Sequence, residues 1–189
     1  MVRGHSELLM PMVEAVMHES GLGYSDLDKI AVTVGPGAFT GLRIGLSTAK
    51  AMAMALQVPA VGLTTLDILA RQFREQQPSA CAVLIETKRD DYYVGVYNAQ
   101  GMAVREPAAM SGAATAELLK EYPDIVLTGD AVERFSSAHA GHAAVPALLP
   151  DAKLMCVMAD VGLGGEPEPL YLRGADVTMP KQPPRTLID

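Results

Sequence analysis

The sequence contains no tryptophan, and only 5% of its 189 residues are aromatic although 49% are hydrophobic. Alanine, leucine, valine and methionine must therefore supply most of the core. The longest plainly apolar helical stretch, 51–56, is far shorter than the roughly 20 residues of a membrane-spanning helix. No signal peptide is visible at the N-terminus, so we expect a cytoplasmic protein.

Cysteine and basic residues are also scarce. Cys81 and Cys156 are far apart and form no C-x-x-C pair, which argues against a disulfide framework or a zinc site. Both are expected to be small buried hydrophobic residues. The formal net charge of −7 works against direct binding of a phosphate backbone, so any contact with nucleic acid should be held by another protein.

The first part of the chain has an alternating helix and strand pattern. Apolar residues three and four positions apart predict a helix over 7–20, with Pro11 costing it one backbone bond. A β-branched run predicts a strand at 30–34. A helix at 42–57, a strand at 58–61 and a helix capped by Thr64 or Thr65 and running to 73 follow. This order indicates an α/β layer.

The middle of the chain changes character. Strands are predicted at 82–87, 92–97 and 102–105, joined as an antiparallel meander. A helix at 113–121, a strand at 125–128 and a helical turn after Asp130 come next. We therefore expect an α/β fold with a first subdomain at 1–75, a second at 76–163, and a tail rich in glycine and proline at 164–189 that wraps the surface or frays.

A glycine-rich turn, with Gly35, Gly37, Thr40 and Gly41, joins a predicted strand to a predicted helix. Such a turn directs backbone N–H groups toward an anion. The spacing fits neither common nucleotide motif, because both the dinucleotide fingerprint and the phosphate loop need glycine where Thr40 stands. No cofactor is expected from this segment.

The following helix has small residues four positions apart, which places them on one face: Gly41, Gly45, Ala49 and Ala53. That face allows close packing either on the protein's own sheet or on a partner helix, and both alternatives stay open. Arg43 opposes the helix dipole by about 0.3–1 kcal/mol. A carboxylate or phosphate opposite Arg43 would explain it, and plain solvation is the alternative.

These two helices form the predicted partner interface. We expect them to build a helical bundle with another protein. The candidate contact residues are Leu8, Met12 and Val16 from the first helix, and Arg43, Ile44, Ser47, Thr48, Ala51 and Met52 from the second.

No catalytic or metal-binding residue is predicted. His139 and His142 lie close in sequence, but no carboxylate stands at ligand spacing beside them, so a solvated loop is expected. Asp90 and Asp91 fit an exposed hairpin turn better than a catalytic pair.

Several motifs together resemble the bacterial TsaB (YeaZ) family. They are His5-Ser-Glu7, the run from Val34 to Lys50 with its G-P-G-x-F-T-G-x-R core, Val58–Gly62, the meander from Ile85 to Tyr97, Leu127–Asp130 and Pro169-Leu-Tyr-Leu-Arg173. The resemblance covers nearly the whole chain in order. It implies an actin-like ATPase, glycoprotease-like fold of two subdomains. Family members carry further strands and a phosphate-facing loop ahead of the first helix, which are missing here, and more often have Asp at the position of Glu86.

The resemblance also implies a function. The chain would be a non-catalytic dimerisation subunit in the synthesis of threonylcarbamoyladenosine at position 37 of tRNAs. It would pair through its first two helices with the metal-binding catalytic subunit TsaD, or with itself, while the ATPase TsaE joins and tRNA is met only through the complex. The alternatives are a glycoprotease-like hydrolase, which needs a helical metal-binding His pair, and a nucleotide-binding actin-like regulator, which needs the missing loop.

Overall fold

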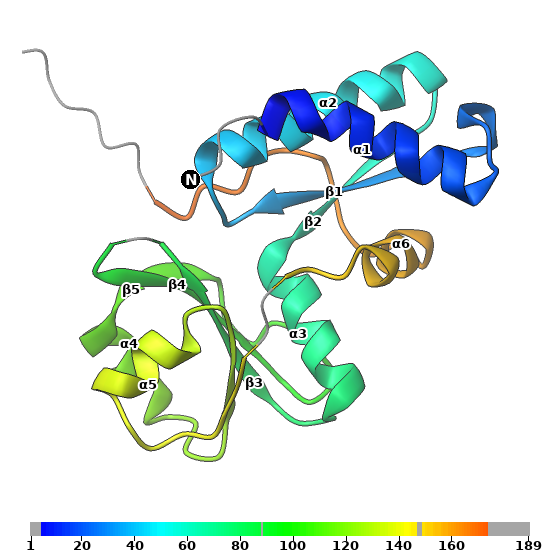
Figure 1. Cartoon of the computed structure of the whole chain (residues 1–189). Coiled ribbons are helices and arrows are strands. Elements are labelled where there is room, and N and C mark those ends of the chain that lie inside the picture. The colour runs from blue at the N-terminus through cyan, green and yellow to red at the C-terminus, as the bar shows by residue number, and fades with distance from the viewer. Residues whose placement is uncertain (1–4, 88, 147–148, 174–189) are drawn as a thin grey trace, which may run out of the picture.

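The protein is built on two β-sheets with helices on their faces (Figure 1). The computed structural model describes residues 5–87, 89–146 and 149–173. The first sheet pairs β1 (Ile30–Gly35) with β2 (Ala60–Thr64) in parallel. The second has the strand order β5-β4-β3-β6-β7. This mixed α/β arrangement is consistent with the actin-like fold that the sequence resemblance implies.

The first sheet is covered on both faces. The helices α1 (His5–Ser20) and α2 (Phe39–Leu56) lie side by side on one face, and α6 (Ala152–Asp160) lies on the other (Figure 1). A short 3-10 helix, η1 (Tyr24–Asp26), joins α1 to β1. Val32 and Val34 of β1 pack against Leu46 and Ala49 of α2. Both apolar faces of this narrow sheet are thereby buried away from water. This burial is the main source of stability in this half of the chain.

The second sheet combines antiparallel and parallel pairs. The strands β3 (Cys81–Glu86), β4 (Asp91–Tyr97) and β5 (Ala108–Ser111) are antiparallel, while β6 (Val126–Gly129) and β7 (Ala144–Pro146) run parallel to β3. Helices α4 (Gly112–Leu119) and α5 (Val132–Ala138) cover one face. Helix α3 (Thr65–Gln76) covers the other. Burial on both faces explains why β3 reads as a continuous apolar run.

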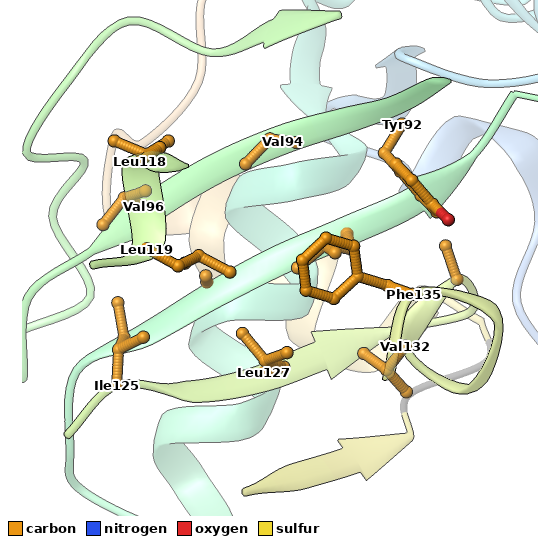
Figure 2. Close-up of a cluster of buried hydrophobic side chains, with 12 residues drawn as sticks. Tyr92, Val94, Val96, Leu118, Leu119, Ile125, Leu127, Val132 and Phe135 are labelled. Carbon is orange, nitrogen blue, oxygen red and sulfur yellow. The ribbon is translucent and has the colours of Figure 1, made fainter. Parts of the chain in front are cut away.

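The largest apolar cluster lies between the second sheet and helices α4 and α5 (Figure 2). Leu127 of β6 points into it from the sheet, and Leu119 and Phe135 approach from the helices. Leu84 of β3 is a fully buried member of the same cluster. The Phe135 ring meets the Tyr92 ring edge-on at 5.5 Å between centroids, the favoured geometry for aromatic pairs. This cluster uses two of the few aromatic residues of the chain.

Helix α3 contacts both sheets, since it packs against β1 and β2 as well as β3 and β6. Its start is fixed by Thr64, one of the two caps that the sequence allowed, whose hydroxyl accepts the Asp67 N–H at 3.0 Å. The buried Tyr97 hydroxyl donates to Asp67 at 2.8 Å and ties β4 to the same turn. Burial, together with the charge of Asp67, raises the pKa of Tyr97.

Two expectations for the second half of the chain need correction. The predicted strand at 102–105 is reduced to a single antiparallel bridge between Ala103 and Tyr97, just after a turn in which the Asn98 side chain accepts the N–H groups of Gln100 and Met102. The strand that pairs with β4 is β5, further along. Neither β7 nor α6 was predicted, although Asp151 caps α6 by accepting the Leu154 N–H at 2.9 Å.

The predicted division at 75/76 falls at the end of α3, and the separate status of the two subdomains stays a prediction. Part of the predicted tail, 174–189, lies outside the described residues. Its first part crosses the first sheet, where Gly165 pairs with Gly62. No helix within the described ranges is long and apolar enough to cross a membrane.

We predict that Gly129→Ala strongly destabilises the fold. Gly129 is buried with φ of +116°, and an added Cβ would stand 2.0 Å from the carbonyl oxygen of Leu84. Strain and overpacking together should remove about 3 kcal/mol or more of unfolding free energy, measured by urea denaturation.

A matched control is Gly45→Ala in α2, where an added Cβ meets no atom within 4 Å. It should raise the unfolding free energy by up to about 1 kcal/mol, because alanine favours the helix. Equal midpoints for Gly129→Ala and the unmodified protein would contradict the packing described for β3 and β6.

Candidate functional site

The outer face of α1 carries a row of exposed apolar side chains. Leu8, Met12 and Val16 are spaced by four and expose 54%, 64% and 64% of their surface. The neighbouring row, Leu9, Val13 and Met17, is half-buried. The helix therefore presents one apolar row to its own chain and a second to the outside.

Helix α2 contributes the other candidate interface residues. Arg43, Ser47 and Ala51 are exposed, whereas Ile44, Thr48 and Met52 are half-buried within the chain. Because α1 and α2 are adjacent, the exposed residues of both helices lie on the same side of the first sheet (Figure 1). The structure thus brings the predicted residues together on one layer, with three of them already partly covered.

The sequence left open whether the small residues of α2 pack on the protein's own sheet or on a partner helix, and the structure divides them between the two. Ala49 and Ala53 are buried, and Ala49 packs with β1. At Gly41 and Gly45 an added Cβ would meet nothing within 4 Å. The first turns of α2 are therefore open to another chain, and the later turns serve the protein's own core.

The glycine-rich turn is shaped by the chain's own C-terminal segment. Gly35 has φ of +102°, and an added Cβ would stand 3.3 Å from the carbonyl oxygen of Leu170. The Leu170 N–H donates to the Val34 carbonyl at 2.8 Å. Gly37, Thr40 and Gly41 are exposed. The first glycine thus permits a close backbone approach, a role that the sequence did not reveal.

Arg43 has aromatic partners that the sequence did not predict. Its guanidinium carbon lies 3.9 Å from the centroid of the Phe39 ring and 6.0 Å from that of Tyr171. Its Nε donates to the Tyr171 hydroxyl at 3.1 Å. A groove of about 360 Å³ lies beside this stack, lined by Arg43, Leu46, Ser47, Lys50, Pro169 and Tyr171. Phe39 and Tyr171 therefore belong to the candidate site.

A polar cluster at the end of β3 was also missed. Glu86 accepts two hydrogen bonds from Arg134, at 2.7 and 2.8 Å, and the Arg134 guanidinium stacks 3.9 Å from the Tyr92 ring centroid. Arg134 also donates to the Asp91 carbonyl at 2.9 Å. The bidentate ion pair holds the Glu86 carboxylate in a defined orientation. Glu86 and Arg134 are separated by 48 positions in the sequence, so local sequence patterns could not predict this pair.

Asp130 joins this cluster by accepting the Glu86 N–H at 2.8 Å. Although the residue is exposed as a whole, its carboxylate lies against the end of β3, and this desolvation raises its pKa. The charge of Glu86 acts in the same direction, and the hydrogen bond from Glu86 opposes it. Ion pairing and hydrogen bonding in this cluster hold β3, β4 and α5 together, so its role is to stabilise the fold.

The sequence predicted that Asp91 lies in an exposed turn, and this prediction is wrong. Its side chain is 15% exposed, forms an ion pair with Arg173, and accepts the Thr87 hydroxyl at 2.6 Å. Asp90 is exposed as expected. The pairing of Asp91 with a residue more than eighty positions away explains the error, since hairpin turn statistics describe local sequence alone.

His139 and His142 lie in a loop, as expected, but both are half-buried, so their predicted solvation is wrong. The His139 ring packs on Phe135 at 4.9 Å between centroids. Within the described part of the chain, no group of three His, Cys, Asp or Glu residues could hold a metal ion.

The two cysteines differ in their surroundings. Cys81 is buried as predicted, and burial raises its pKa to about 12. Cys156 is exposed, contrary to expectation, because it lies on the outer side of α6, an element that the sequence did not predict.

Comparison with known proteins gives consistent matches. Residues 1–157 match the family model of TsaD, the tRNA N6-adenosine threonylcarbamoyltransferase. Over 65 residues the chain is 51% identical to that transferase from Erythrobacter litoralis, which covers 34% of this chain and 19% of the relative. Over 95 residues it is 33% identical to the tRNA threonylcarbamoyladenosine biosynthesis protein TsaB of Bacillus subtilis, covering 50% of this chain and 41% of the relative.

Solved structures match over a longer span. The crystal structure of an uncharacterised Pseudomonas aeruginosa protein with similarity to peptidase YeaZ superposes with a TM-score of 0.75 at 32% identity. That match covers 90% of this chain and 85% of the solved chain.

The curated relatives extend well beyond the matched region, which is about a fifth of the transferase and less than half of TsaB. The matched family model, the TsaB relatives and the YeaZ structures agree with the motifs found in the sequence. The chain belongs to the TsaD family, and within it to the TsaB (YeaZ) type.

Proposed function

We propose that this chain is a non-catalytic dimerisation subunit of the machinery that forms threonylcarbamoyladenosine at position 37 of tRNA. It pairs with a TsaD-type catalytic subunit through the outer faces of α1 and α2. Family membership supports a role in tRNA threonylcarbamoylation, because the relatives that the chain matches are named for that modification. A TsaE-type ATPase is the further partner of the same assembly, and self-association through the same face is the alternative pairing.

The observation that carries the proposal is the exposed apolar row on α1. Leu8, Met12 and Val16 stand in water on one helix face, beside the open first turns of α2. Burying one such side chain fully is worth about 1.5–3 kcal/mol. Contiguous apolar surface of this kind on a folded protein marks a site of interaction with another protein.

The composition of α2 suits helix packing. Ser47 and Ala51 are small and exposed, and Gly41 and Gly45 have no neighbouring atoms that a Cβ would meet. Small residues allow helix axes to approach toward the lower end of the 8–10 Å range, which is about the separation found in helical bundles. A partner helix can therefore lie across α2 while its apolar side chains reach the row on α1.

The polar groups of the chain support a non-catalytic role. Glu86, Arg134 and Asp91 are engaged with one another or with Arg173, and this engagement leaves them poorly placed to act on a substrate. A net charge of −7 disfavours direct contact with tRNA phosphates. In this proposal the partner subunit supplies the reacting groups and the tRNA surface.

We predict that a charge introduced at the centre of the α2 face abolishes pairing. In the complex, Ala51→Glu or Ser47→Glu would bury a carboxylate without a partner, at a cost of about 3 kcal/mol or more. That cost corresponds to a more than hundredfold rise in Kd for the TsaD-type subunit from the same organism, measured by isothermal titration calorimetry.

The matched control is Gln100→Glu, which adds the same charge at an exposed position in the turn after β4. Circular dichroism should show all three variants folded, because the substituted residues are exposed in the isolated chain. If the α2 variants bind as tightly as Gln100→Glu, the two-helix interface is wrong.

A second prediction concerns activity. The purified chain should hydrolyse ATP and cleave casein at no more than background rates, since its sequence fits neither nucleotide motif and its polar clusters are internally paired. The measurement is phosphate release and peptide release under steady-state conditions. Turnover that disappears in His139→Ala or His142→Ala would reveal an enzyme and overturn the proposed role.

A further inference from the structure

The C-terminal strap, residues 163–173, fastens the candidate interface to the rest of the molecule. Gly165 exchanges two backbone hydrogen bonds with Gly62 of β2, at 2.8 and 2.9 Å, and Leu170 donates to Val34 of β1. Beyond Leu170, the strap ends with Arg173 paired to Asp91 of the second sheet. Tyr171 therefore lies between two fixed points, and its ring is held against Phe39 at 5.7 Å between centroids.

This arrangement orients Arg43. The guanidinium stacks on Phe39 and donates one hydrogen bond, from Nε, to the Tyr171 hydroxyl. Stacking and hydrogen bonding restrict a side chain that otherwise has many rotamers. Restriction before binding reduces the entropy that is lost on binding, so an oriented guanidinium is a better anion receptor than a free one.

The two terminal nitrogens of Arg43 have no acceptor among the residues that the structure describes, and no carboxylate there lies within ion-pair distance. The other cation of the adjoining groove, Lys50, is paired with Glu168 at 2.5 Å. The groove therefore carries one uncompensated positive charge, on an exposed fork that fits two oxygen atoms.

We propose that Arg43 binds a carboxylate of the partner protein, from an aspartate or glutamate that enters the groove beside α2. Phe39 and Tyr171 are positioning residues for this contact. The one uncompensated positive charge of the groove matches the single negative charge of a carboxylate. The inference rests on the proposed function, because it names the chemistry of the partner at that same interface.

The test compares three variants in binding to the TsaD-type subunit without nucleotide. Arg43→Lys keeps the charge but removes the fork, and should raise Kd about tenfold. Tyr171→Phe keeps the ring but removes the hydroxyl, and should raise Kd about threefold. Arg105→Lys, at an exposed arginine in the loop before β5, is the control and should leave Kd unchanged.

Ala51→Glu separates this inference from the proposed function. If Ala51→Glu abolishes binding while Arg43→Lys binds normally, the interface stands and the carboxylate contact is wrong. If Arg43→Lys weakens binding only when ATP is present, the fork holds a phosphate, which also overturns the inference. If Ala51→Glu binds normally, the proposed interface itself fails.

A direct chemical measurement is available in the same variant. The amine introduced by Arg43→Lys can be joined to a neighbouring carboxylate by a carbodiimide, which forms an amide without a spacer. Mass spectrometry of the digested complex should find position 43 linked to an aspartate or glutamate of the TsaD-type subunit. A complex that forms without any link at position 43, while other lysines are linked across the interface, would contradict the proposal.

Discussion

Burial of β3 on both faces is the constraint on which the rest of the second sheet depends. Leu84 points toward α4 and α5, while Val83 and Ile85 point toward α3. A strand enclosed in this way needs helices on both sides and strand partners at both edges. Gly129 meets the same constraint, because β6 approaches the backbone of Leu84 so closely that no side chain fits.

Helix α3 links the first sheet to the second. It packs on β3 with one part of its surface and on β1 and β2 with another, so both sheets share one helix. The Tyr97 hydroxyl fixes the first turn of α3 from the second sheet through Asp67. The outer layer of α1 and α2 then rests on a sheet whose position is already determined by the larger core.

The candidate interface follows from how that outer layer is built. A two-stranded sheet offers a narrow apolar face, and α2 occupies it with Leu46, Ala49 and Ala53. Helix α1 is half-covered, and its second apolar row stays in water. The strap then adds Tyr171 to the start of α2, so residues from distant parts of the chain form a single surface. In our proposal, this surface is where the catalytic partner docks and where Arg43 meets its carboxylate.

The sequence by itself determined the main helices and strands, the apolar periodicity of α1, and the family. These features depend on local periodicity, capping by Thr64, and a long ordered motif, all of which can be read within short segments. Only the tertiary structure decided the pairing of Arg43 with Tyr171, the partners of Glu86 and Asp91, and the role of Gly35. Each of these depends on a contact with a residue distant in the chain, such as Tyr171, Arg134, Arg173 or Leu170, and local patterns carry no information about which distant segments meet.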